Sequence, residues 1–146
     1  MPAPDDLSYV LVDVFTDTPF GGNPLACRAA LETLTIMESE GVLANAVAMG
    51  DAIRAGLATK FAGVAGVKQI RGVGMMIGIE LDRPCGQLVQ RALAAGLLIN
   101  VTADTVIRLV PPLVYTRAHV DELVDRLAPL VTAFLAESAQ PQAASA

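Results

Sequence analysis

A glycine-rich turn in front of an expected helix is the first feature that could carry chemistry. Residues 18–26, Thr-Pro-Phe-Gly-Gly-Asn-Pro-Leu-Ala, join two glycines to an asparagine suited to cap a helix and a proline tolerated at its first position. The backbone N–H groups and the positive dipole end of such a start attract anions such as phosphate. An ordinary helix start explains the same residues, so both interpretations stay open on this pattern alone.

A lone arginine in an apolar stretch is the second feature. Arg108 lies within Val-Ile-Arg-Leu-Val-Pro-Pro-Leu, residues 106–113. Its planar guanidinium suits a carboxylate, and burying it without a partner would be costly. We therefore expect an exposed strand face, an internal acid as partner, or a carboxylate ligand.

Other reactive side chains are sparse. The single histidine, His119, is expected at the surface in the first turn of the last helix. Cys27 and Cys85 lie in apolar stretches and are expected to be buried free thiols. The sequence has no Cys-X-X-Cys, no histidine pair and no tight carboxylate cluster, so we expect no protein-bound metal ion.

The composition of the chain limits the classes of partner that it is expected to bind. A chain of 146 residues fits one domain with a real core. The formal charge is −5 and the basic residues are scattered, which argues against nucleic acid or a membrane surface and favours small molecules or proteins. No apolar run approaches the roughly 20 residues of a membrane span, and the N-terminal residues lack a signal-peptide pattern, so we expect a cytoplasmic protein.

Periodicity predicts helices and short strands along the chain. Apolar stripes predict helices at 24–40, from Val42 to near Phe61, from Pro84 to just before Gly96, and after a Thr116 cap through Phe134. Alternation or β-branched residues predict strands at 9–15, 73–81, 97–101 and 106–110. These elements favour an α+β fold with a short, mostly antiparallel sheet packed against helices.

Four segments together resemble a known family. They are the turn at 20–26, Ile-Arg-Gly-Val-Gly-Met-Met-Ile-Gly-Ile-Glu-Leu at 70–81, Leu-Leu-Ile-Asn-Val at 97–101, and residues 106–113. In order and spacing they resemble the C-terminal part of class III, fold-type I, pyridoxal-phosphate-dependent aminotransferases of the acetylornithine type. The resemblance covers about residues 20–136. It implies the small α+β domain of a dimeric, cytoplasmic enzyme of arginine biosynthesis that transfers an amino group from N-acetylornithine to 2-oxoglutarate.

The resemblance also implies roles for single residues. Arg108 matches the family's substrate-carboxylate arginine, and the family's phosphate-binding threonine falls on Pro19, one position after Thr18. The residues expected at the cofactor phosphate are Thr18, Phe20, Gly21, Gly22 and Asn23. The family's Schiff-base lysine lies upstream of the turn, whereas Lys60 and Lys68 follow it. We therefore expect no catalytic residue, no turnover and no bound pyridoxal phosphate from this chain alone.

The N-terminal residues resemble a second family. Residues 8–26 are similar to the first strand and turn of the phenazine-biosynthesis isomerases, and the two resemblances overlap on residues 20–26. This overlap predicts a chimera, with an isomerase-like segment at 1–19, an aminotransferase domain at 20–136 and a disordered tail at 137–146. That family's catalytic glutamate segment does not follow Ala26, so isomerase activity is the weakest alternative. A non-catalytic, self-associating fold or oligomerisation module is the other.

Overall fold

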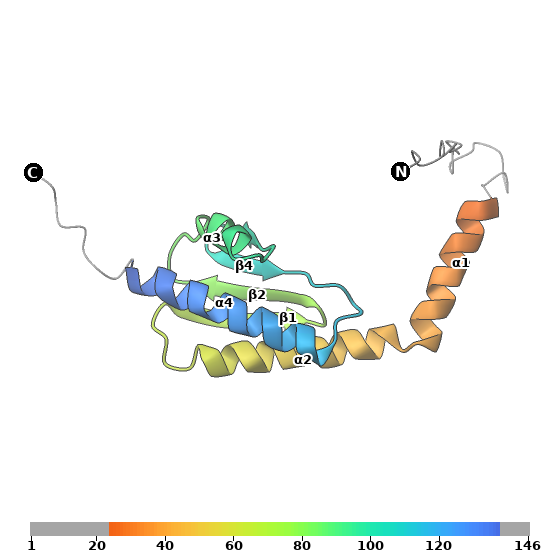
Figure 1. Cartoon of the computed structure of the whole chain (residues 1–146), viewed down its shortest axis with the longest axis horizontal. Helices are drawn as coiled ribbons and strands as arrows, with labels where there is room; N and C mark the ends of the chain where they lie inside the picture. Colours follow the sequence, from red (N-terminus) through yellow and green to blue (C-terminus); the bar gives the residue numbers. More distant parts are fainter. Residues whose placement is uncertain (1–23, 138–146) are drawn as a thin grey trace, which may run out of the picture. The chain divides into compact units, whose positions relative to one another are not determined.

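The computed structural model describes residues 24–137, which belong to two units divided after Glu40. The first unit contributes helix α1, Pro24–Ser39 (Figure 1). The second contains α2 (Val42–Lys60), β1 (Val67–Val73), β2 (Met76–Leu81), α3 (Leu88–Ala94), β3 (Asn100–Thr102), β4 (Val106–Leu109) and α4 (Arg117–Glu137). The predicted helices at 24–40 and from Val42 to near Phe61 are confirmed. The strand predicted at 9–15 lies outside the described residues.

The large apolar residues of helix α1 are mostly exposed to solvent. The exposed fraction is 61% for Leu31 and 58% for Leu34. Cys27 is also exposed and free, so the expectation that it is buried is wrong.

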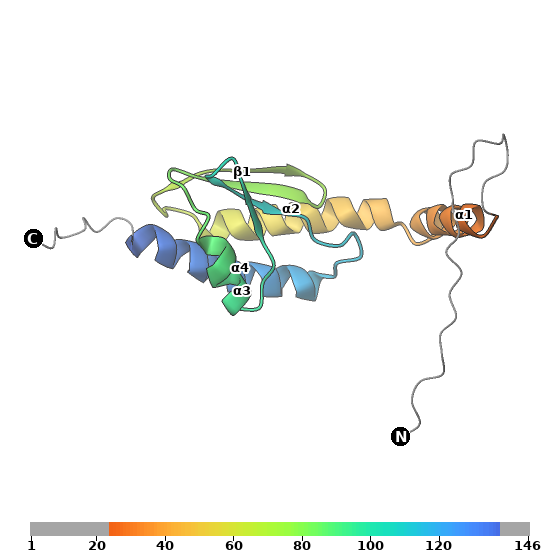
Figure 2. The same cartoon turned by 90° about the horizontal axis from the view of Figure 1, so that it is seen from above.

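The second unit is built on one antiparallel sheet. The strand order is β1-β2-β4-β3, and each neighbouring pair runs antiparallel. Helices α2, α3 and α4 lie on one side of the sheet, as the view from above shows (Figure 2). The α+β fold expected from the sequence is therefore confirmed.

The core lies between that face of the sheet and the helices. Alternate residues of β2, Ile77, Ile79 and Leu81, are fully buried, because successive side chains of a strand point to opposite faces. They join Ile53 and Leu57 of α2 in one apolar cluster. The predicted stripe of α4 completes the cluster with Val120, Leu123, Val124, Leu127, Val131 and Phe134, and Leu130 is partly buried.

The prediction of a single strand at 73–81 is wrong, because this segment belongs to two strands, β1 and β2. The chain turns at Gly74 and Met75, where Gly74 has a φ of 53°, and β1 pairs back onto β2. The turn was hidden because Met75 is 4% exposed and so continues the apolar alternation. Strand β1 went unpredicted because only Val67 and Ile70 of its residues are partly buried.

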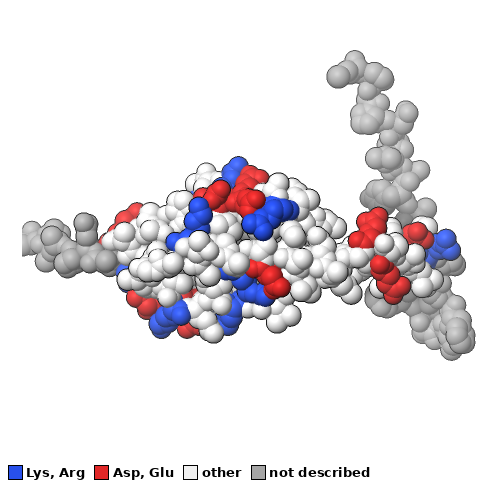
Figure 3. Space-filling view, turned by 90° about the horizontal axis from the view of Figure 1, so that it is seen from below, with Lys and Arg blue, Asp and Glu red and all other residues white. Residues whose placement is uncertain are grey.

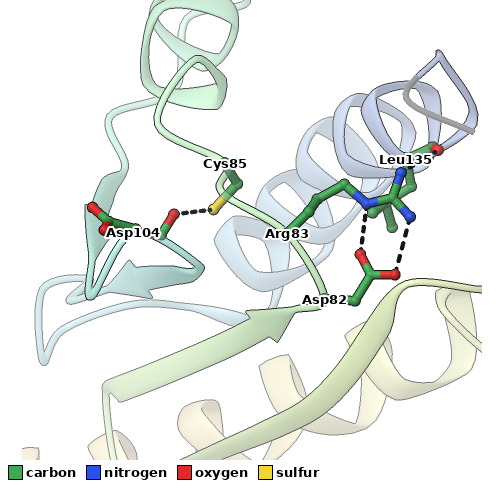
Figure 4. Close-up of polar contacts among 5 residues, drawn as sticks. All are labelled: Asp82, Arg83, Cys85, Asp104 and Leu135. Carbon is green, nitrogen blue, oxygen red and sulfur yellow. Dashed lines mark hydrogen bonds and ion pairs between the residues drawn. The ribbon is translucent and has the colours of Figure 1, made fainter.

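The helix predicted from Pro84 begins later, at Leu88. The backbone N–H of Cys85 donates to the carbonyl of Asp104 at 2.8 Å instead of entering a helix. The two residues face each other in Figure 4, where the Cys85 thiol also reaches the same carbonyl at 3.5 Å. Burial raises the pKa of this thiol. The strands β3 and β4 confirm the predicted pair, although β3 begins only at Asn100.

An ion pair follows the end of β2. Arg83 donates to both carboxylate oxygens of Asp82, at 2.6 and 3.0 Å, and also to the carbonyl of Leu135 at 3.5 Å (Figure 4). The hydrogen bonds from Arg83 hold the pKa of Asp82 below its ordinary value of 3.8. The pair thereby links the end of β2 to the last turns of α4.

We expect Gly50→Ala to destabilise the second unit. Gly50 is buried in α2, and an added Cβ would collide with the backbone carbonyl of Gly74. The helix propensity of alanine would favour the variant by about 1 kcal/mol, but overpacking against backbone should cost about 1–3 kcal/mol. Urea unfolding would measure the difference. Gly86→Ala is the control, because a Cβ there meets nothing within 4 Å, and equal stability of the two variants would contradict the packing argument.

We expect Asp82 to stabilise the fold above pH 3.8 and to lose that effect as the pH falls. A carboxyl whose pKa is lower in the folded chain favours folding while it is ionised, and the contribution disappears as the pH drops through the folded-state value. The unfolding free energies of the wild-type chain and of Asp82→Asn should therefore converge at acid pH. Unfolding curves recorded from about pH 6 down to about pH 2 would show this. A constant difference across that range would disprove it.

Candidate functional site

The face of the sheet opposite the helices carries the predicted carboxylate ligand, Arg108. The registers align Arg71 with Gly78 across β1 and β2, Gly78 with Arg108 across β2 and β4, and Arg108 with Asn100 across β4 and β3. Residues opposite one another in an antiparallel sheet share a face. Arg71 and Arg108 therefore flank Gly78 on the open face.

A groove of about 620 Å³ lies over this row. Arg71, Thr102 and Arg108 supply its polar side chains, and Val73, Met76 and Val106 supply apolar walls. A Cβ at Gly78 would lie 3.4 Å from Val106 Cγ1 and 3.9 Å from Arg71 Cγ, so the glycine leaves the floor free of a side chain. The volume of the groove is within the range of small-molecule sites, about 300–1,000 Å³.

Arg108 differs from every other arginine of residues 24–137. Its side chain is exposed, and within that range it forms no ion pair or side-chain hydrogen bond. Each of the others pairs with a carboxylate: Arg28 with Glu32, Arg54 with Asp51, Arg71 with Glu80, Arg83 with Asp82, Arg91 with Glu137, Arg117 with Asp121 and Arg126 with Glu122. Of the interpretations left open by the sequence, the exposed strand face is confirmed, and no described acid pairs with Arg108.

The second arginine of the groove is engaged. Arg71 Nη1 donates to Glu80 Oε2 at 2.5 Å and to Gln69 Oε1 at 3.1 Å. Sequence reasoning missed Arg71 as a groove residue and Glu80 as its partner because it did not predict the hairpin that pairs β1 with β2. The available signal was Gly74 itself, a turn residue with an Arg before it and a Glu after it, which a hairpin brings onto adjacent strands.

The residues expected at the cofactor phosphate, Thr18, Phe20, Gly21, Gly22 and Asn23, lie outside the described residues. Neither lysine lines the groove: Lys60 ends α2 and pairs with Asp125 at 2.9 Å, and Lys68 is an exposed residue of β1. The described part of the chain therefore does not fit a Schiff base beside Arg108, and we derive no step through the cofactor.

The remaining candidates are structural. His119 is exposed and its Nδ1 accepts the backbone N–H of Thr116 at 3.1 Å, while Thr116 Oγ1 accepts from the His119 N–H at 3.4 Å. Both the surface histidine and the Thr116 cap were predicted. Among residues 24–137 no group of three His, Cys, Asp or Glu side chains is placed to hold a metal ion, and no helix in that range is long and apolar enough to cross a membrane.

Charges of both signs are mixed over the face shown in Figure 3, with blue and red side chains side by side. This face carries no basic stripe of the kind that tracks a nucleic-acid backbone.

Comparison with known proteins identifies the family of this chain. The family model of class-III aminotransferases matches residues 10–131. The chain therefore belongs to the class-III aminotransferase family. The match begins within residues 8–26, so the isomerase-like segment and the domain boundary after residue 19 stay predictions.

The relatives are acetylornithine and ornithine aminotransferases. Acetylornithine aminotransferase 1 of Bordetella parapertussis is 52% identical over 82% of this chain. The ornithine aminotransferase of Toxoplasma gondii ME49 superposes with a TM-score of 0.73 at 31% identity over 82% of this chain and 30% of its own. The N-acetylornithine aminotransferase of Stenotrophomonas maltophilia K279a superposes with a TM-score of 0.69 at 33% identity. The superposition covers 80% of this chain and 33% of that one. The chain spans only about 30% of the length of the curated relative from Bordetella.

Proposed function

We propose that this chain supplies the small domain of an acetylornithine-type aminotransferase, in which Arg108 binds a substrate carboxylate. The observation that carries the proposal is the unpaired guanidinium of Arg108 on the open face, beside a groove of about 620 Å³. Membership of the class-III family and the similarity to acetylornithine aminotransferases support it.

The groove suits an amphipathic acid. A guanidinium offers two parallel N–H donors to a carboxylate, which fixes the orientation of the bound molecule as well as its position. Val73, Met76 and Val106 would contact the aliphatic part of the same molecule. An amino acid such as N-acetylornithine or an oxo acid such as 2-oxoglutarate has both parts.

The proposal assigns the remaining chemistry to residues beyond this groove. Pyridoxal phosphate supplies an electron sink when bound, and its phosphate is assigned to Thr18, Phe20, Gly21, Gly22 and Asn23. The Schiff-base lysine would come from another polypeptide or from a further part of the protein. The chain by itself is therefore proposed to be inactive, and, like its parent enzymes, to act in the cytoplasm as part of a homo-oligomer.

A non-catalytic assembly module is the second candidate. It is favoured by α1, where Leu31 and Leu34 expose more than half of their surface. Helices with an exposed apolar face commonly associate with a partner, because association removes that surface from water.

We expect 2-oxoglutarate to bind at Arg108. Titration of the isotope-labelled full chain should shift the backbone amide signals of Gly78, Thr102 and Arg108, and Arg108→Gln should weaken binding on the order of tenfold, because a charge-assisted hydrogen bond is lost. Arg117→Gln is the matched control, since Arg117 is exposed but pairs with Asp121 on α4. Equal affinity in both variants would refute the assignment.

We expect no covalent adduct when the purified chain is mixed with pyridoxal phosphate and reduced with borohydride. Lys60 is paired with Asp125, and neither Lys60 nor Lys68 lies at the groove. Intact-mass analysis would detect an adduct, and a saturable one on a single lysine would contradict the proposed inactivity. Light scattering on the same sample tests the assembly module, because a clean monomer would count against self-association.

A further inference from the structure

Glu80 is the acid that the sheet register places closest to Arg108 on the open face. Strand β2 aligns Gly78 with Arg108 and Glu80 with Val106, so Glu80 and Arg108 are diagonal neighbours on adjacent strands. Such neighbours are about 7–8 Å apart, within the reach of long side chains. A pair between them would occupy the guanidinium that the proposed function requires.

In the structure the side chain of Glu80 is directed toward β1 and away from β4. Its carboxylate accepts from Arg71 Nη1 at 2.5 Å, and Arg71 also donates to Gln69 Oε1 at 3.1 Å. Arg71 and Gln69 both belong to β1, which flanks β2 on the side away from β4. The interaction therefore directs the carboxylate of Glu80 away from Arg108.

The stem of Arg71 lies beside Gly78, which has no side chain of its own. Arg71 lies directly across from Gly78, and its Cγ would be 3.9 Å from a Cβ at that position. The guanidinium of Arg71 meets Glu80, one pleat further along β2.

We propose that Arg71 is a positioning residue that holds Glu80 away from Arg108 and so keeps Arg108 free to bind a carboxylate. This inference rests on the proposed function of Arg108. Together, Arg71, Glu80 and Arg108 give the open face one net positive charge, located at Arg108. If Arg71 is removed, Arg108 is the remaining arginine within diagonal reach of Glu80, and the two charges would cancel.

Labelling with phenylglyoxal, an arginine-selective reagent, tests the inference on the full chain. The rate at Arg108 is followed by peptide mass spectrometry for the wild type, Arg71→Gln, Glu80→Gln and the double variant, each with and without 2-oxoglutarate. Arg71→Gln should slow labelling of Arg108 about two- to fivefold, the range expected for one exposed ion pair. The double variant should restore the wild-type rate, a rescue that a merely structural role of Arg71 would not produce. Arg71→Lys, which keeps the charge, should behave as the wild type.

The outcomes separate this inference from the proposed function. An unchanged rate at Arg108 in Arg71→Gln would overturn the positioning role. Glu80→Gln gives an independent check if Arg71→Gln does not fold: faster labelling of Arg108 would mean that Glu80 already pairs with it in the wild type. Protection of wild-type Arg108 by 2-oxoglutarate reports on the proposed function alone, and its absence would refute that function whatever the rates in the variants.

Discussion

The arrangement of this protein depends on the two-residue period of its central strands. In β2 and β4 every second side chain enters the core, where Ile77, Ile79 and Ile107 are fully buried. The residues between them face the other way, so burying one set fixes the position of the other. Arg108 lies on the open face because Ile107 and Leu109 beside it are buried. A slip of one residue would place the guanidinium in the core and expose the apolar residues.

Glycines adapt this sheet to its neighbours at two places. Gly50 lets α2 approach the backbone of the β1–β2 turn, and Gly78 leaves the floor of the groove open. One glycine therefore serves packing and the other serves the site, although both sit inside regular elements where their backbone entropy is a cost. At Gly50 the close approach of one backbone to another limits which side chains fit.

The charge that the groove can offer a ligand depends on which charged side chains of the open face are paired. Surface ion pairs contribute little to stability, but they decide which charges remain for a ligand. The other arginines of residues 24–137 are each neutralised by a nearby carboxylate, whereas Arg108 is not. The chain spans about 30% of its curated relative, and the proposed carboxylate site depends on this one unpaired cation.

The sequence by itself determined helices α1, α2 and α4, the α+β class and the family. Long apolar stripes such as that of α4 repeat over several turns, so their period identifies them without tertiary information. It also singled out Arg108, because a cation in an apolar strand is unusual enough to need a reason. What only the tertiary structure decided was the hairpin at Gly74 and Met75, the late start of α3, and the pairing of Arg71 with Glu80. Each depends on a contact between segments: Met75 is buried although it lies in a turn, and Cys85 bonds to Asp104 across the fold. Such contacts leave no periodic trace in the sequence, since they are set by which strands become neighbours.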